Sequence, residues 1–188
     1  MKHLRITALA AVAAMAFMAL GAGSASADLY TDAGKTVKYP TGTTISATLA
    51  AGKSASLHSG SQTIGTCTGG EVHGSTANET GTVLDVISSM TWTGCSQTTH
   101  TVASGSLSIS ISGEVTGSGS QVTLVFFGVS CTYGTAEGTK LGTLGSGETP
   151  ALKMNAKTPK VAGGFLCPSF ITWEAEIIVT APHALYVG

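Results

Sequence analysis

The sequence has 188 residues, of which 43% are apolar and only 10% are charged, and its formal net charge is −1. This length fits one globular domain, and scarce charge beside abundant apolar residues excludes an intrinsically disordered chain. Because Lys and Arg are not in excess, the composition also argues against a nucleic-acid-binding protein.

The first 27 residues have the three-part layout of a secretory signal peptide. Basic residues precede an apolar run over residues 6–20, and small residues end in Ala25-Ser26-Ala27 before Asp28. The run is shorter than the roughly 20 residues that span a membrane, and no comparably long apolar stretch follows it. We therefore predict cleavage after Ala27, one β-rich domain over residues 28–188, and no integral membrane span in the mature chain.

The mature chain predicted in this way is acidic and contains no arginine. Seven Lys against ten Asp and Glu give it a net charge of −3, because Arg5 is the only arginine of the sequence. Arginine is the side chain best suited to bidentate recognition of phosphate. Its absence argues against phosphorylated ligands, and we expect no nucleic-acid partner.

Short strands separated by turns rich in Gly, Ser and Thr dominate the mature chain. No window of 11 residues or more has the three-and-four spacing of an amphipathic helix. Candidate strands in chain order are residues 44–49, 54–57, 63–68, 71–75, 83–92, 106–112, 122–129, 139–144, 151–155 and 171–179. This pattern predicts an all-β fold, a single antiparallel β-sandwich or flattened barrel.

Two segments carry the clearest alternation of apolar and polar residues. In residues 106–112, Leu107, Ile109 and Ile111 share one face, and we expect this strand to form an antiparallel hairpin with residues 122–129. The longest alternation places five apolar residues on one face and Thr and Glu on the other, and it ends before Pro182; the apolar residues are Ile171, Trp173, Ala175, Ile177 and Val179.

All four cysteines lie in the predicted mature chain: Cys67, Cys95, Cys131 and Cys167. An even number in an exported domain indicates two disulfides, and the absence of a Cys-x-x-Cys motif argues against zinc and thioredoxin-like sites. Of the three possible connectivities, we favour Cys67–Cys95 with Cys131–Cys167, because each pair closes the smaller loop available.

The histidines of the mature chain have no metal-ligand spacing: His58, His73, His100 and His183. A hydrolase triad from His73, His100 and Asp85 lacks the Gly-x-Ser-x-Gly motif that holds the nucleophile. Glu174 and Glu176 are the closest pair of carboxylates, but the simpler interpretation is the solvent face of a strand. We therefore assign no catalytic, cofactor-binding or metal-ligating residue, and no cofactor is expected.

The two tryptophans have two interpretations. Trp173 is in phase with the apolar face of its strand, and Trp92 lies three residues before Cys95, so both are expected in the core. The alternative is an exposed platform on which a sugar ring stacks, beside Tyr133 or Tyr186 in a groove.

The order of several motifs resembles small exported bacterial proteins of the alkane-oxidation activator type. The segment Ser54-Ala55-Ser56-Leu57, then Cys67, and then Val86–Cys95 carry the resemblance, which covers residues 54–95. It implies an extracytoplasmic β protein associated with the cell envelope or matrix, with no catalytic site to transfer. Cys131, Cys167 and the region after Trp173 belong to no motif of that group.

Export and disulfide signals without converging chemistry predict a non-enzymatic protein that acts in the bacterial cell envelope or extracellular matrix. Its location would be secreted or periplasmic, and its partner would be an envelope or matrix component. The alternative is a secreted binding module for a glycan or an apolar ligand.

Overall fold

The computed structural model describes residues 27–79, 82–96, 99–102, 105–126 and 128–188. Within these ranges the chain forms strands and no helix, which confirms the predicted all-β fold. The strands are β1 Leu29–Tyr30, β2 Thr44–Leu49, β3 Ala55–Ser59, β4 Gln62–Ser75, β5 Asn78–Glu79, β6 Thr82–Cys95, β7 Thr99–Val102, β8 Gly105–Ile109, β9 Glu114–Ser118, β10 Gln121–Phe126, β11 Val129–Gly134, β12 Thr139–Leu144, β13 Ala151–Ala162, β14 Phe170–Ala181 and β15 Tyr186–Val187.

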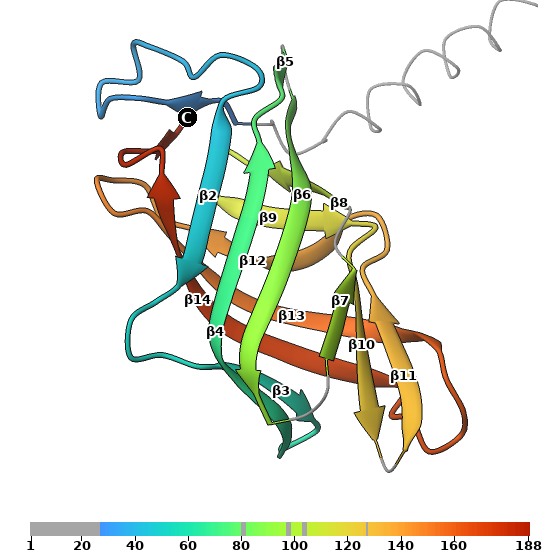
Figure 1. Ribbon diagram of the computed structural model, residues 1–188. Coiled ribbons are helices and arrows are strands. Elements are labelled where there is room, and N and C mark those ends of the chain that lie inside the picture. The colour runs from blue at the N-terminus through green and yellow to red at the C-terminus, as the bar shows by residue number, and fades with distance from the viewer. Residues whose placement is uncertain (1–26, 80–81, 97–98, 103–104, 127) are drawn as a thin grey trace, which may run out of the picture.

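Eight of these strands close into an antiparallel barrel. The order around the ring is β2, β4, β6, β8, β9, β12, β13 and β14, and β14 pairs with β2 to complete it. Closure removes the unpaired edges that an open sheet would expose. The barrel is therefore the observed form of the predicted sandwich or flattened barrel (Figure 1).

The longest strands of the ring, β4, β6, β13 and β14, continue beyond it and carry a second set of short strands. There β3 pairs with both β4 and β14, while β11 pairs with β13, β10 with β11, and β7 with β10. We call this part of the molecule, with the loop of residues 163–169, the disulfide end (Figure 1). Both predicted disulfides are present there, Cys67–Cys95 and Cys131–Cys167, and no cysteine is free.

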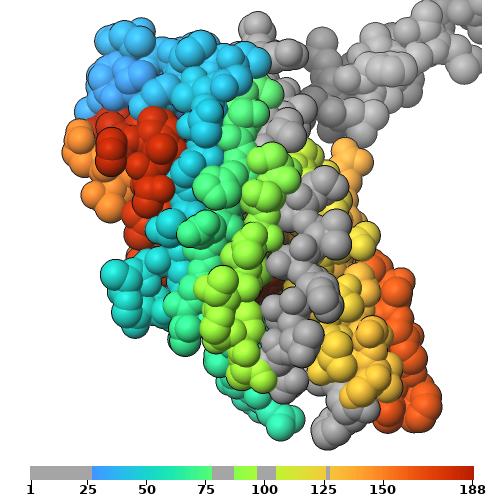
Figure 2. All heavy atoms as spheres, viewed as in Figure 1, coloured from blue at the N-terminus to red at the C-terminus, as the bar shows by residue number. Residues whose placement is uncertain are grey.

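The opposite end of the barrel holds the first described residues and the end of the chain, which lie against each other in Figure 2. Strand β1 pairs with β15, and the Asp28 and Gly188 backbones exchange hydrogen bonds of 2.7 and 3.0 Å. Ala27 is buried and its N–H donates to the Ile109 carbonyl. The predicted signal peptide falls almost wholly outside the described residues, so its cleavage stays a prediction.

The predicted hairpin between residues 106–112 and 122–129 is wrong. Strand β8 ends at Ile109, and a tight turn, in which Gly113 N–H donates to the Ser110 carbonyl, leads into β9, which pairs with β8. Ile111 lies in this turn and is 59% exposed. The segment Glu114–Ser118 was not predicted as a strand because its Gly and Ser resemble turn residues, although Val115 is buried in the barrel.

The predicted strand 122–129 is in fact divided between two strands. β10 ends at Phe126 and β11 begins at Val129, and the two pair as a hairpin. The predicted strands 63–68 and 71–75 are, conversely, the single strand β4. In both places local apolar content was an inadequate guide to where the chain reverses.

Alternation along β14 is confirmed residue by residue. Ile171, Trp173, Ala175, Ile177 and Val179 are all at most 9% exposed, whereas the intervening residues are more accessible. Because neighbouring side chains of a strand point to opposite faces, the barrel interior receives every second residue. The same rule places Glu174 and Glu176 on the outer wall.

Candidate functional site

A polar groove lies on the outer wall of the barrel, where β13, β14 and the chain leading into β3 meet. Its volume is about 350 Å³, it is open to solvent, and its polar lining includes Lys53, Ser56, Lys153, Asn155, Glu174 and Glu176. The register of the sheet creates it, because β14 places its Glu residues opposite polar residues of the adjoining strands.

Each carboxylate of this groove has polar neighbours of its own. Asn155 Nδ2 donates to Glu174 Oε1 at 3.4 Å, and His58 Nε2 lies 3.7 Å from Glu174 Oε2. Glu176 Oε2 lies 3.8 Å from Lys53 Nζ, in a pair that solvent reaches. Exposed pairs of this kind contribute about 0–1 kcal/mol. The two carboxylates thus form part of a solvated outer face, as the sequence predicted.

Of the three residues considered for a hydrolase triad, His73, His100 and Asp85, only His73 has a described side chain. His73 is exposed on β4, with Nδ1 3.2 Å from Ser46 Oγ and Nε2 3.7 Å from Glu71 Oε2. The side chains of Asp85 and His100 lie outside the described part of the structure.

Within residues 27–79, 82–96, 99–102, 105–126 and 128–188, no group of three or more His, Cys, Asp or Glu side chains is placed to hold a metal ion. In the same ranges, no helix has the length and apolar character needed to cross a membrane.

The two tryptophans pack against each other in the core. Trp92 and Trp173 are 8% and 9% exposed, and their ring centroids are 5.0 Å apart with the planes tilted by 53°. Gly70 lies opposite Trp92 in the β4–β6 ladder, and a Cβ there would be only 2.5 Å from the indole ring. The ring therefore covers bare backbone, and neither tryptophan is available as an exposed stacking platform.

Two small apolar cavities lie among the described residues of the barrel interior. Their volumes are about 80 and 40 Å³, and they share the wall residues Ile87, Met90, Leu141 and Met154. Pockets that hold organic ligands usually measure about 300–1,000 Å³. Neither of these two cavities is large enough for a lipid or a sugar.

Tyr133 is fully buried beside the smaller cavity, and its hydroxyl has no hydrogen-bond partner among the described residues. Burial raises the pKa of this phenol above its ordinary value of 10.0. The folded protein therefore keeps the proton at a pH where the unfolded chain ionises. The ionisation of Tyr133 therefore leaves the free energy of unfolding unchanged below pH 10. It lowers this free energy as the pH rises from 10 toward the pKa of Tyr133 in the folded protein.

We expect Tyr133→Phe to raise the free energy of unfolding by about 1 kcal/mol at neutral pH, because it removes an unpaired buried hydroxyl. The advantage should widen above about pH 10, where only the wild type has this phenol to ionise on unfolding. Urea titrations of both proteins on either side of that pH measure the difference. A variant less stable than wild type at both pH values would contradict the expectation.

Exposed apolar side chains gather at the disulfide end. Of six large apolar residues that are exposed in the described part of the chain, four lie within ten positions, namely Val161, Phe165, Leu166 and Phe170. Phe165 and Leu166 lie within residues 163–169, the connection between β13 and β14, which we call the apolar loop, and Val161 and Phe170 flank it. The apolar loop was not among the sites predicted from the sequence, although Gly163-Gly164 before Phe165-Leu166 and Pro168 after them are typical of a turn that carries an apolar pair.

Comparisons with protein-family models, curated proteins and solved structures found no match for this chain. The resemblance to the alkane-oxidation activator proteins stays an expectation that rests on residues 54–95.

Proposed function

We propose that this protein is a non-enzymatic exported protein that acts in the bacterial cell envelope or extracellular matrix, and that the apolar loop makes its contacts. The observation that carries the proposal is the exposure of Phe165 at 93% and of Leu166 at 51% on a connection tied down by a disulfide. Exposed apolar clusters on soluble domains commonly mark interaction sites.

Other features of the chain support an extracytoplasmic location. Two disulfides are typical of proteins that fold in an oxidising compartment, and the first 27 residues resemble a signal peptide.

The alternative, a binding module for a glycan or an apolar ligand, has less support. Trp92 and Trp173 are buried, and the larger interior cavity of about 80 Å³ is a fraction of the size that such a ligand requires. A binding site inside the barrel would require a large rearrangement of its core.

Fractionation of a bacterium that expresses the full chain tests the proposal. We expect the protein to begin at Asp28, to lie outside the cytoplasm, and to be retained by the envelope or the matrix. Mass spectrometry of the N-terminus and immunoblots of the fractions provide the measurement. A product that keeps Met1 in the cytoplasm, or one entirely free in the medium, would contradict the proposal.

A further inference from the structure

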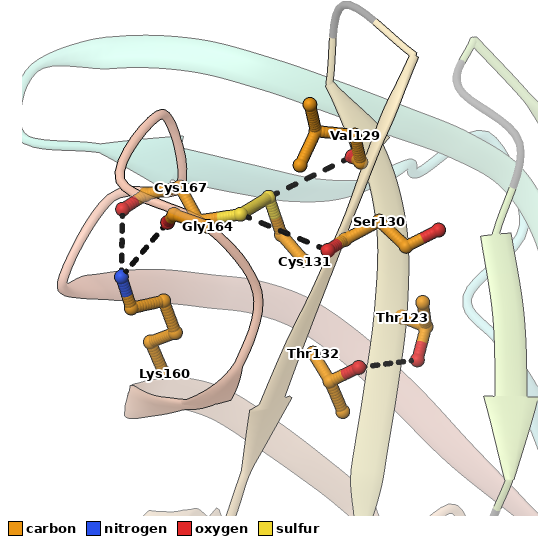
Figure 3. Close-up of a disulfide and its surroundings, with 8 residues drawn as sticks. All are labelled: Thr123, Val129, Ser130, Cys131, Thr132, Lys160, Gly164 and Cys167. Carbon is orange, nitrogen blue, oxygen red and sulfur yellow. Dashed lines mark hydrogen bonds between the residues drawn. A yellow bond between two sulfur atoms is a disulfide. The ribbon is translucent and has the colours of Figure 1, made fainter.

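The apolar loop is held in a fixed shape by its surroundings (Figure 3). Cys167 is bonded to Cys131 of β11, and Lys160 Nζ donates to the carbonyls of Gly164 and Cys167 at 3.1 and 3.3 Å. Gly163 has φ +123, and a Cβ there would lie 2.6 Å from Cys167 Sγ. The disulfide thus packs directly on the start of the loop, and binding would require little further ordering.

The apex of this loop carries two consecutive apolar side chains that the protein leaves in water. Phe165 is almost fully exposed and Leu166 is half exposed, and Val161 and Phe170 extend the apolar surface along the ends of β13 and β14. The same fold buries apolar residues efficiently elsewhere, with Ile171 at 0% exposure one position after Phe170. The exposure is therefore a local property of the loop and not of a poorly packed domain.

The charge around the loop is positive in an otherwise acidic protein. From Ala151 to Trp173 the chain has three lysines and no Asp or Glu, and β3, β10 and β11 also lack acidic residues. Lys157 Nζ lies 3.9 Å from the centroid of the Phe170 ring. In the described part of the chain, no ion pair involves Lys157 or Lys160. No described carboxylate therefore neutralises either charge, and the exposed Lys157 is available to a negatively charged partner, while Lys160 is held by the two loop carbonyls.

We propose that the partner of the apolar loop is the surface of an anionic lipid bilayer, an inference that rests on the proposed envelope function. Phe165 and Leu166 would enter the boundary between headgroups and acyl chains, while Lys157 meets a headgroup phosphate and the charge of Lys160 adds to the attraction. Apolar side chains combined with basic ones are the usual means of interfacial attachment. Charge complementarity selects an anionic surface.

The size of the loop favours a bilayer over a protein partner. An exposed Phe and an exposed Leu present a few hundred Å² of surface, whereas a stable interface between proteins buries about 1,200–2,000 Å². A bilayer needs only a few inserted side chains and favourable charge, so a small protruding apex is sufficient. A protruding tip can also insert into a lipid surface, whereas a concave pocket cannot.

Vesicle sedimentation with the oxidised mature chain tests this inference. We expect binding to vesicles of phosphatidylglycerol and phosphatidylcholine, with weaker binding to phosphatidylcholine alone. The double variant F165S/L166S should bind about 100-fold more weakly, since it removes two inserted apolar side chains. Lys157→Gln should weaken binding about fivefold, and added salt should do the same.

Matched control variants separate insertion from general hydrophobicity. V37S/I111S removes two other exposed apolar side chains, 56% and 59% accessible, near the opposite end, and Lys35→Gln removes a lysine there, so both should bind as wild type does. Unchanged thermal unfolding of every variant would show that the barrel is intact. Equal losses in the two double variants would overturn the inference.

The same experiment distinguishes this inference from the proposed function. A wild type that binds isolated envelope in a loop-dependent way but ignores anionic vesicles would overturn the lipid partner and leave the envelope function standing, with a protein or glycan as the partner. Failure to bind either preparation would overturn both.

Discussion

Replacing Trp173 with Ala is expected to lower the free energy of unfolding by about 3–5 kcal/mol, as for other buried aromatic residues. The ring is 9% exposed, packs against Trp92 with the ring centroids 5.0 Å apart, and lines the smaller interior cavity, so its removal would enlarge that cavity. Trp92→Ala should have a similar cost because it uncovers the Gly70 backbone as well. Denaturant titration followed by circular dichroism measures both.

Two further variants of β14 serve as controls for the loss of the tryptophan ring. Trp173→Phe keeps an aromatic ring and should recover part of the lost stability, and Glu174→Gln, on the outer face of the same strand, should change stability by less than about 0.5 kcal/mol. An alanine variant with wild-type stability and impaired envelope binding would show that the tryptophan belongs to a binding surface instead of the core.

Removal of either disulfide is expected to be nearly as costly. The bonds close chain separations of 28 and 36 residues, for which loop-closure entropy in the unfolded chain predicts about 4 kcal/mol each. Because this entropy depends on the logarithm of loop length, C67A/C95A and C131A/C167A should have similar effects. Unfolding titrations of the two double variants provide the test.

The second disulfide has a further expected effect that the first lacks. C131A/C167A releases the apolar loop from β11, so Phe165 and Leu166 would lose their fixed presentation even where the barrel remains folded. Envelope binding should therefore weaken in this variant more than in C67A/C95A. Equal binding by the two variants would show that the loop needs no covalent anchor.

The sequence was informative wherever alternation ran without interruption. Along β14 the pattern of Ile171 to Val179 predicted burial correctly, and the loop-length argument paired the cysteines correctly. The sequence was a poor guide where a barrel strand consists mainly of small and polar residues. β9 contains Val115 between Glu114 and Thr116, and its strand character comes from pairing with β8 and β12, which local composition does not reveal.

Barrel closure also depended on information beyond local pattern. β2 and β3 follow each other in the sequence, and each pairs with both β4 and β14. They lie at different positions along these two strands, and only the long-range register decides where each one pairs. A sandwich and a barrel have the same alternation along each strand, so the sequence alone left both open.

The candidate site was only partly predictable for a related reason. Glu174 and Glu176 were predicted on the solvent face because they alternate with apolar residues. Phe165 and Leu166, by contrast, are the residue types that fill cores, and nothing in their identity indicates exposure. Their orientation follows from the Cys131–Cys167 bond and the lysine contacts that fix the loop.

The most direct test of the account is the binding of purified mature protein to isolated cell envelope, comparing wild type with F165S/L166S and with the matched V37S/I111S control. The account predicts that wild type and V37S/I111S sediment with the envelope, that F165S/L166S remains in the supernatant, and that all three unfold at the same temperature. Retention of F165S/L166S at the wild-type level would contradict the assignment of the apolar loop as the contact surface.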